Sequence, residues 1–237
     1  MIQFYAPDIV ETRTLPEQES IHCCRVLRMR EGDIIYVTDG KGHRYECTIV
    51  ESHPKHCVVE ILSTVDIKPW WGFRIELCVA PSKNMDRMEW LVEKAVEIGV
   101  DRIVIMKCER SERKTLRKER LEKIAVSAMN QSLKANLTEV SEPIDFRKLL
   151  AEEFSGYKCF GYCDESLPRA SFSERYKGGD VRILIGPEGD FSPAEVEMAI
   201  NHGYEAVTFG GSRLRLETAA LYAAVASHVI GDVTAES

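Results

Sequence analysis

Two short glycine-rich segments near the end of the chain carry the residues best suited to bind a ligand. The first, Gly186-Pro187-Glu188-Gly189, follows the apolar run 181–185, and the second begins at Gly210-Gly211 after the apolar run 206–209. Each run has the length and β-branched content of a buried strand, and neither glycine cluster continues a strand or a helix. Glycine loops at the carboxyl ends of neighbouring strands are where open α/β sheets bind ligands. The pattern therefore predicts a binding site that both loops form.

The residue types in these loops limit the kind of ligand. Neither loop has the G-x-G-x-x-G pattern of dinucleotide sites or the G-x-x-x-x-G-K-[ST] pattern of triphosphate sites. The acidic residues Glu188, Asp190 and Glu217 disfavour a polyphosphate. They suit a ligand with an adenine or ribose to hydrogen-bond and a positive centre to balance. Two tight turns that use glycine for its special dihedral angles would leave the same pattern, so this alternative stays open.

Helix signals follow each loop. Ser192 is expected to be an N-cap, with Pro193 at the first helical position and Glu195 at the third, in a helix that ends near Gly203. An alanine-rich helix after the second loop runs to about Ile230. The segment from 181 to 230 is thus predicted to be strand, loop, helix, strand, loop, helix.

The rest of the chain divides into a small β region and an α/β region. The β region, up to about residue 66, has a predicted helix and three predicted strands, at 17–30, 34–37, 44–50 and 57–62. After a linker at 63–72, alternating strand and helix patterns begin. They predict strands at 75–80, 102–106 and 158–163, helices at 85–98, 115–133 and 143–153, and a loop at 164–179.

The two loop motifs together resemble one enzyme family. Leu184 to Ser192, LIGPEGDFS, and Leu214 to Ala220, LRLETAA, are similar to the RsmE family of ribosomal-RNA methyltransferases, which belongs to the knotted SPOUT superfamily. The family pattern is roughly IGPEGGF and then LR-x-ETA, and this chain departs from it at Asp190, where glycine is usual. The stretches from His22 to Asp33 and from Glu93 to Val100 also match.

The resemblance implies a fold and an activity. It implies a C-terminal α/β domain at 72–237, of SPOUT type, with a mostly parallel sheet and a deep trefoil knot. It also implies a PUA-like β-barrel domain for RNA binding at 1–68. The implied reaction is methylation of a uridine N3 in small-subunit (16S) ribosomal RNA with S-adenosylmethionine. The implied partners are that RNA, free or in the small subunit, and a second copy of the chain in a homodimer.

Site residues follow from the same resemblance. The expected catalytic residues are Arg215, the first choice for stabilising charge on the uridine, and Glu217, which could hold Arg215 or hydrogen-bond the ring. The expected cofactor-binding residues are Leu184, Gly186, Pro187, Glu188, Gly189, Phe209, Gly210, Leu214, Leu216, Thr218 and Ala219. The expected RNA-binding residues are Arg25, Arg28, Lys83, Arg110, Arg113 and Lys134.

Charge is distributed unevenly along the chain. The 237 residues carry a net charge of −7, which does not by itself indicate nucleic-acid binding. Residues 107–134 nevertheless hold nine Lys and Arg against four Glu, a local charge of +5, whereas 182–237 holds three Arg against eight acidic residues, a local −5. A basic strip on an acidic protein steers a polyanion to one face. A solvated helix surface with i,i+4 ion pairs is the alternative interpretation.

The cysteine spacing and the hydropathy of the chain indicate whether it binds a metal and where in the cell it is expected. The eight cysteines include no C-x-x-C pair, and neither they nor the six histidines show zinc-ligand spacing, so no metal is expected. No apolar run approaches the roughly 18 residues of a membrane helix. With no recognisable signal peptide, these features predict a cytoplasmic protein with reduced thiols and no membrane partner.

Three other function classes compete with this interpretation. An RNA-binding module without catalysis predicts degraded loop motifs, yet the motifs are intact. An enzyme for a small nucleotide-like metabolite predicts neither the β domain nor the basic strip. A SPOUT methyltransferase with another RNA target or another methylated atom is the nearest rival, and only the RsmE-like motifs argue against it.

Overall fold

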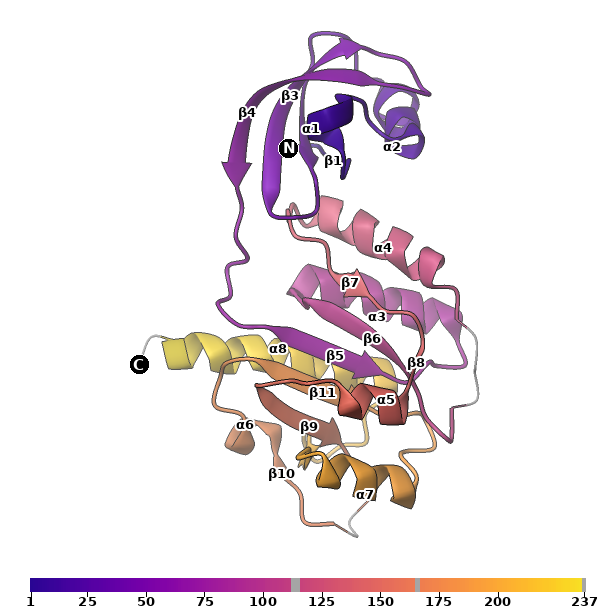
Figure 1. Ribbon diagram of the computed structural model, residues 1–237, viewed down its shortest axis with the longest axis vertical. Coiled ribbons are helices and arrows are strands. Elements are labelled where there is room, and N and C mark those ends of the chain that lie inside the picture. The colour runs from indigo at the N-terminus through magenta and orange to yellow at the C-terminus, as the bar shows by residue number, and fades with distance from the viewer. Residues whose placement is uncertain (112–115, 165–166, 236–237) are drawn as a thin grey trace. The chain divides into compact units, whose positions relative to one another are not determined.

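The computed structural model describes residues 1–111, 116–164 and 167–235 (Figure 1). Two compact units are present. The first comprises 1–70 and 126–137, and the second comprises the remaining described residues. The segment 126–137, which the sequence-based division assigned to the second domain, therefore packs with the first unit.

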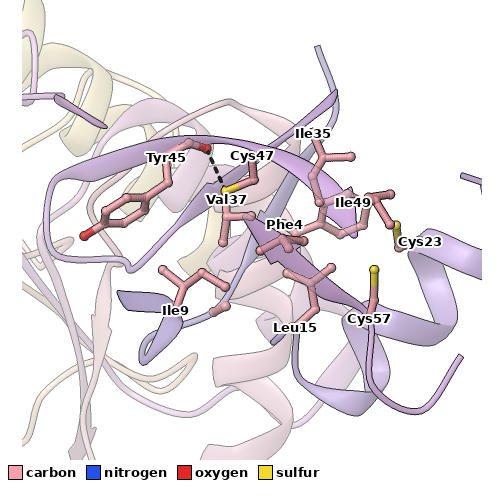
Figure 2. Close-up of a cluster of buried hydrophobic side chains, with 12 residues drawn as sticks. Phe4, Ile9, Leu15, Cys23, Ile35, Val37, Tyr45, Cys47, Ile49 and Cys57 are labelled. Carbon is pink, nitrogen blue, oxygen red and sulfur yellow. Dashed lines mark hydrogen bonds between the residues drawn. The ribbon is translucent and has the colours of Figure 1, made fainter. Parts of the chain in front are cut away.

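A four-stranded sheet forms the centre of the first unit. Its order is β1 (Gln3–Tyr5), β2 (Ile34–Thr38), β3 (His43–Glu51) and β4 (Val58–Asp66). β1 pairs with β2 in parallel, and the other pairs are antiparallel. Phe4, Ile35 and Val37 from these strands form a hydrophobic core together with Ile9 and Leu15, as Figure 2 shows. The predicted small β unit is thus present.

The helix expected at 17–30 is wrong in length and in type. The α-helix α2 covers only Glu17–Ile21, and a π-helix, η1 (His22–Val26), continues it. The helical run stops there because Arg28 adopts a left-handed φ of 56°. A further short helix, α1 (Ile9–Thr12), lies before it.

Residues from the end of α4 (Lys118–Gln131) complete the first unit. The Gln3 side chain donates to the Lys134 carbonyl at 2.7 Å, and the Gly42 amide donates to the Ala135 carbonyl at 2.9 Å. The helix ends before the expected Leu133, whose φ of 56° is left-handed. These hydrogen bonds explain why a segment so distant in sequence belongs to this unit.

A parallel sheet forms the second unit and confirms the predicted α/β class. Its strands are β5 (Ile75–Val79), β6 (Arg102–Lys107), β7 (Glu139–Val140), β8 (Ile144–Asp145), β9 (Tyr157–Gly161), β10 (Ala170–Ser171), β11 (Val181–Ile185) and β12 (Glu205–Thr208). Their order is β10-β12-β9-β11-β5-β6-β7, with β8 also pairing with β6, and every pair is parallel.

The two strands that precede the glycine loops are not neighbours. β9 lies between β11 and β12, with Cys159 opposite Ile183 on one side and Phe160 opposite Ala206 on the other. The expectation that the loops follow adjacent strands is therefore wrong. Because β9 is paired along both edges, the chain leaving β11 must cross it through α7 (Pro193–Asn201) before β12 can add to the sheet.

Helices flank this sheet, and their ends follow the expected capping chemistry. α3 (Met85–Ile98) ends at Gly99, which has a left-handed φ of 112°. In α7, Ser192 accepts from the Glu195 amide while the Glu195 side chain accepts from the Ser192 amide, which confirms the predicted capping box. α8 (Leu216–Ala235) packs against α3. Among the described helices, none combines the length and apolarity needed to cross a membrane.

Two predicted segments of this unit differ in the structure. The helix expected at 143–153 is shorter, because β8 occupies its first residues and α5 (Phe146–Ala151) begins only after Asp145, which caps it. The loop expected at 164–179 contains β10 and α6 (Phe172–Arg175), whose capping box starts at Ser171.

A buried row of charges crosses three strands of the parallel sheet. Arg182 on β11, Glu76 on β5 and Arg102 on β6 stand opposite one another in the strand register. The Arg182 Nε lies 2.6 Å from one Glu76 carboxylate oxygen, and their side chains are only 2% and 1% exposed. The other oxygen lies 2.6 Å from Arg74 and 3.8 Å from Arg102. One carboxylate therefore contacts three guanidinium groups, and Glu152 supplies a second carboxylate, 3.0 Å from Arg102 and 3.5 Å from Arg182.

Replacing Glu76 with alanine tests this row. The variant leaves the buried Arg182 without its closest counter-charge and only Glu152, at 3.5 Å, beside it, so we expect a loss of about 3 kcal/mol in the free energy of unfolding, measured by urea denaturation. Glu153→Ala removes an exposed carboxylate of the same unit and serves as the control. A loss in Glu76→Ala no larger than that of the control contradicts the structural role of the row.

Candidate functional site

The first glycine loop turns sharply after β11 and is fixed by Asp190. This residue has a left-handed φ of 59°, and its amide donates to the Pro187 carbonyl at 2.9 Å. Its carboxylate accepts from the Phe191 amide at 2.9 Å and from the Cys163 amide at 3.3 Å. Aspartate is one of the few residues besides glycine that visit this conformation routinely. Asp190 thus keeps the turn and adds a link to the chain that follows β9.

The second glycine loop is also attached to β9. A Cβ atom on Gly161 would lie 2.7 Å from the Phe209 ring, so the close approach of these two residues requires glycine. The Tyr162 amide donates to the Val207 carbonyl at 3.1 Å. The end of β9 therefore contacts both loops and takes part in building the site together with the ends of β11 and β12.

Beyond Phe209 the second loop is open. Gly210 has a left-handed φ of 119°, and a Cβ atom on Gly210 or Gly211 would meet nothing within 4 Å. Phe209 is half-buried, with its ring centroid 5.6 Å from that of Phe172 and 6.1 Å from that of Tyr222. The loop therefore presents exposed backbone beside a fixed aromatic ring.

A pocket lies beside the first loop. It has a volume of about 570 Å³ and is lined by Glu188 and by the segment 82–87, which follows β5. The Ser82 hydroxyl donates to the Glu188 carboxylate at 3.0 Å, and Ser82 is buried. Glu188 thus closes one wall of the pocket while its carboxylate stays accessible.

Glu217 lies in the first turn of α8 and is held by a residue that the sequence did not suggest. Its carboxylate lies 3.6 Å from the Arg87 Nε, and its side chain is 11% exposed. Arg87 also lines the pocket. The described ion pair of Glu217 is therefore with Arg87, whereas the sequence suggested Arg215, which is exposed.

Arg110 supports the first loop from outside. Its guanidinium donates to the Gly189 carbonyl at 2.9 Å and to the Phe191 carbonyl at 3.3 Å. The adjoining Glu109 amide donates to the Glu195 carboxylate at 2.8 Å, which ties the same segment to the start of α7. Arg110, predicted as an RNA contact, thus has a structural partner in the candidate site.

The other predicted cofactor residues vary in exposure. Leu184, Pro187 and Leu216 are buried, Gly186, Leu214 and Ala219 are half-buried, and Gly189 and Thr218 are exposed. A Cβ atom on Gly186 would lie 3.0 Å from the Phe191 ring, so this glycine also allows a close approach.

The predicted RNA-binding residues are spread over both units. Arg25 and Arg28 are exposed on the first unit, at η1 and just after it, and Lys134 is half-buried there. Lys83 is exposed and lines the pocket in the second unit. Arg113 lies outside the described residues.

Sequence reasoning missed Ser82, Arg87 and Gly161. Ser82 and Glu188 lie 106 residues apart, and no motif joins them. One signal was available: Ser82 follows a predicted strand of the same sheet, at whose carboxyl end ligand-binding residues gather. Together these groups offer hydrogen bonds and charge to a ligand in the pocket.

Known proteins match both units. A family model described as an RNA methyltransferase domain matches residues 70–228, and one described as an RNA methyltransferase PUA domain matches residues 15–62. The chain is 27% identical over 225 residues to ribosomal RNA small subunit methyltransferase E of Bacillus subtilis strain 168, covering 90% of this chain and 88% of that protein.

Solved structures are similar over nearly the whole length. A probable rRNA-methyltransferase from Porphyromonas gingivalis has 43% identity and a TM-score of 0.93, covering 98% of this chain and 99% of that one. Ribosomal RNA small subunit methyltransferase E from Neisseria gonorrhoeae, bound to S-adenosyl methionine, has 28% identity and a TM-score of 0.86, covering 97% and 98%.

The support that Arg110 gives to the first loop is testable without a ligand. In Arg110→Ala the carbonyls of Gly189 and Phe191 lose a charged donor, so we expect amide hydrogen exchange in 186–191 to accelerate about tenfold. Lys107→Ala, which removes an exposed cation at the end of β6, is the control. Equal exchange in the two variants would contradict the supporting role and leave Arg110 available for RNA alone.

Proposed function

The chain belongs to the RNA methyltransferase family, and we propose that it transfers a methyl group from S-adenosylmethionine to N3 of a uridine in small-subunit ribosomal RNA. The match of the RNA methyltransferase domain model to residues 70–228, which include both glycine loops, carries the proposal. The similarity to two proteins named ribosomal RNA small subunit methyltransferase E supports the choice of substrate.

The two loops fit the cofactor chemically. S-adenosylmethionine supplies a methyl group on a positively charged sulfur, together with an adenosine. The open backbone at Gly210 and Gly211, beside the Phe209 ring, suits a flat base and a ribose. The accessible carboxylate of Glu188 suits the positive charge. The predicted cofactor residues from Leu184 to Gly189 and from Phe209 to Ala219 therefore remain our assignment.

Positioning supplies most of the catalysis in this proposal. Methyl transfer needs the donor and the attacking nitrogen in line and asks for little covalent chemistry from the protein. The N3–CH3 bond forms as the S–CH3 bond breaks, and the N3 proton passes to solvent; as it leaves, negative charge develops on the flanking carbonyl oxygens. We assign Arg215 to stabilise that charge, because it is exposed in the second loop. Glu217 acts through Arg87, whose guanidinium it holds at the pocket wall.

RNA binding is assigned to both units. Uridine N3 is paired in a duplex, so the target base must be unpaired or flipped out of the stack. The PUA domain match at 15–62 supports an RNA-binding role for the first unit, with Arg25 and Arg28 as exposed cations. Lys83, Arg110, Arg113 and Lys134 complete the proposed set. We place catalysis in 72–237 and a dedicated RNA-binding domain in 1–68, and residues of 72–237 contribute further RNA contacts.

We further propose that α8 pairs with a second copy of the chain. Tyr222, Val225, Val229 and Val233 follow one another at intervals of three or four residues, so they share a helix face, and they are 50%, 46%, 58% and 63% exposed. Such a row of large apolar side chains marks an interaction surface. The deep trefoil knot expected from the family also remains part of the proposal.

The dimer is tested by placing a charge on this face. Val229→Asp should convert the dimer to monomer at micromolar concentration in sedimentation velocity, because an unpaired carboxylate would be buried at the contact. Ile200→Asp introduces the same charge at an exposed position of α7 and should remain dimeric. A monomeric parent protein, or a dimeric Val229→Asp, contradicts the assignment.

The activity is tested with labelled S-adenosylmethionine and small ribosomal subunits that lack the uridine-N3 mark, followed by mass mapping of the RNA. We expect one new 3-methyluridine. Arg215→Ala should lower turnover about 100-fold while cofactor affinity stays within about threefold, because one charge-stabilising group is lost. Arg147→Ala, at an exposed position of α5, is the control.

Each other outcome has a defined meaning. If the methyl group is found on a different atom or a different RNA, the substrate assignment is wrong and the methyltransferase assignment stands. Full activity of Arg215→Ala removes that residue from the mechanism. Cofactor binding without transfer to any RNA, or no cofactor binding, contradicts the proposed reaction.

A further inference from the structure

Three cysteine side chains of the first unit converge on one point. The Sγ atoms of Cys23, Cys24 and Cys57 all lie within 4.8 Å of one another. Cys23 and Cys57 are fully buried and Cys24 is half-buried. Figure 2 shows the sulfur atoms of Cys23 and Cys57 at one end of the hydrophobic core. Because Cys57 is 33 residues from Cys24, the sequence spacing gave no indication of this group.

The backbone around the three thiols is unusual and firmly held. Cys23 and Cys24 lie in the π-helix η1, where the Leu27 amide donates to the His22 carbonyl at 3.0 Å. Single π-turns inside helices are rare and occur frequently at functional sites. Here the π-turn presents two consecutive side chains to the same partner, which the regular spacing of an α-helix disfavours.

Cys57 is held from both sides of its peptide unit. Its amide donates to the Ser20 hydroxyl at 2.9 Å, and its carbonyl accepts from the Leu15 amide at 2.9 Å. The Ser52 hydroxyl donates to the Met29 carbonyl at 2.8 Å, which ties the segment before Cys57 to the end of the helical run. The three thiols therefore face one another from a preorganised backbone.

We propose that Cys23, Cys24 and Cys57 bind one thiophilic metal ion, Zn²⁺ or Cu⁺. Two sulfurs on a tetrahedral zinc ion with bonds of about 2.3 Å stand roughly 3.8 Å apart, so the thiols need to move closer by about 1 Å or less. The group contains no carboxylate and no imidazole, and a purely sulfur donor set selects soft ions over Mg²⁺ or Ca²⁺. The half-buried Cys24 provides the route of entry from solvent.

Binding of the metal ion releases protons from the cysteine thiols. Each thiol that becomes a ligand loses its proton to solvent as its metal–sulfur bond forms. Three thiolates around Zn²⁺ leave one negative charge at the edge of the core, where a water molecule at the open side completes the four ligands that zinc prefers. Cu⁺ needs no fourth ligand. No sulfur is oxidised in either case.

A bound ion would cross-link η1 to the start of β4. Cys23 and Cys24 belong to η1, whereas Cys57 directly precedes β4. Metal binding energy becomes folding energy when the ligands come from separate segments. The site lies in the unit that carries the PUA domain match and uses no residue of the proposed methyl-transfer site. Its occupancy is therefore measurable independently of methyl transfer.

The test uses the full chain, purified with a non-thiol reductant and stripped of metal. Zn²⁺ alone and Cu⁺ alone are added in separate titrations against a competing chelator, and Co²⁺ serves as a spectroscopic probe of thiolate ligation. We expect one ion per chain, a thiolate-to-cobalt charge-transfer band, and a higher Tm in the presence of the ion. Binding of only one of the two ions identifies which of them the site takes.

Matched variants separate ligation from folding. Cys24→Ser changes a half-buried thiol and should weaken binding at least tenfold while far-UV circular dichroism stays unchanged. Cys47→Ala alters another buried cysteine of the same core, whose thiol instead contacts the Tyr45 carbonyl at 3.8 Å, and should bind as the parent does. Cys163→Ser, at an exposed thiol of the second unit, excludes surface binding.

Three results would overturn the proposal. One is the absence of stoichiometric binding of either ion to the reduced parent chain. Another is equal affinity in Cys24→Ser and the parent. The last is a disulfide among the three cysteines that persists in the reduced preparation, found by peptide mass mapping, since it would remove two of the ligands.

Discussion

A single buried carboxylate, that of Glu76, holds the register of the parallel sheet. It lies opposite Arg182 on one neighbouring strand and Arg102 on the other, and it forms the shortest of its contacts with Arg182 and Arg74. A shift of one residue between β5 and β11 would separate the buried Arg182 from this carboxylate, at a cost of several kcal/mol. Because register determines where each strand ends, the ion row also determines where the glycine loops begin.

The strand that separates the two loops gives the site its form. Since β9 lies between β11 and β12, both loops contact the end of β9. The first loop does so through the Asp190 carboxylate, and the second through the close approach of Gly161 and Phe209. Ser82 and Arg87 are added from the end of β5 on the far side of β11. The candidate site is therefore assembled from four strand ends, and only two of them carry a motif that a reader of the sequence would notice.

Features set by local chemistry were predictable, and those set by long-range contacts were not. The capping box at Ser192, the stop at Gly99 and the parallel α/β class follow from signals within a few residues. The place of β9 in the sheet and the Ser82–Glu188 hydrogen bond depend on pairings across roughly 25 to 106 residues, for which no local pattern exists. The early end of the helix after Glu17 coincides with the left-handed backbone at Arg28, a conformation that no helix signal in the sequence predicts.

The aspartate in the first loop has an entropic consequence. Where the family pattern has glycine, Asp190 restricts the backbone of the unfolded chain and, once folded, anchors the turn by three hydrogen bonds. Much of the conformational entropy of this loop is therefore lost during folding rather than on ligand binding. A ligand that meets an already ordered loop gains affinity without new contacts and selects a shape that exists before it arrives. The turn at Asp190 is therefore ordered before a ligand arrives, whereas the backbone at Gly210 and Gly211 has free space around it.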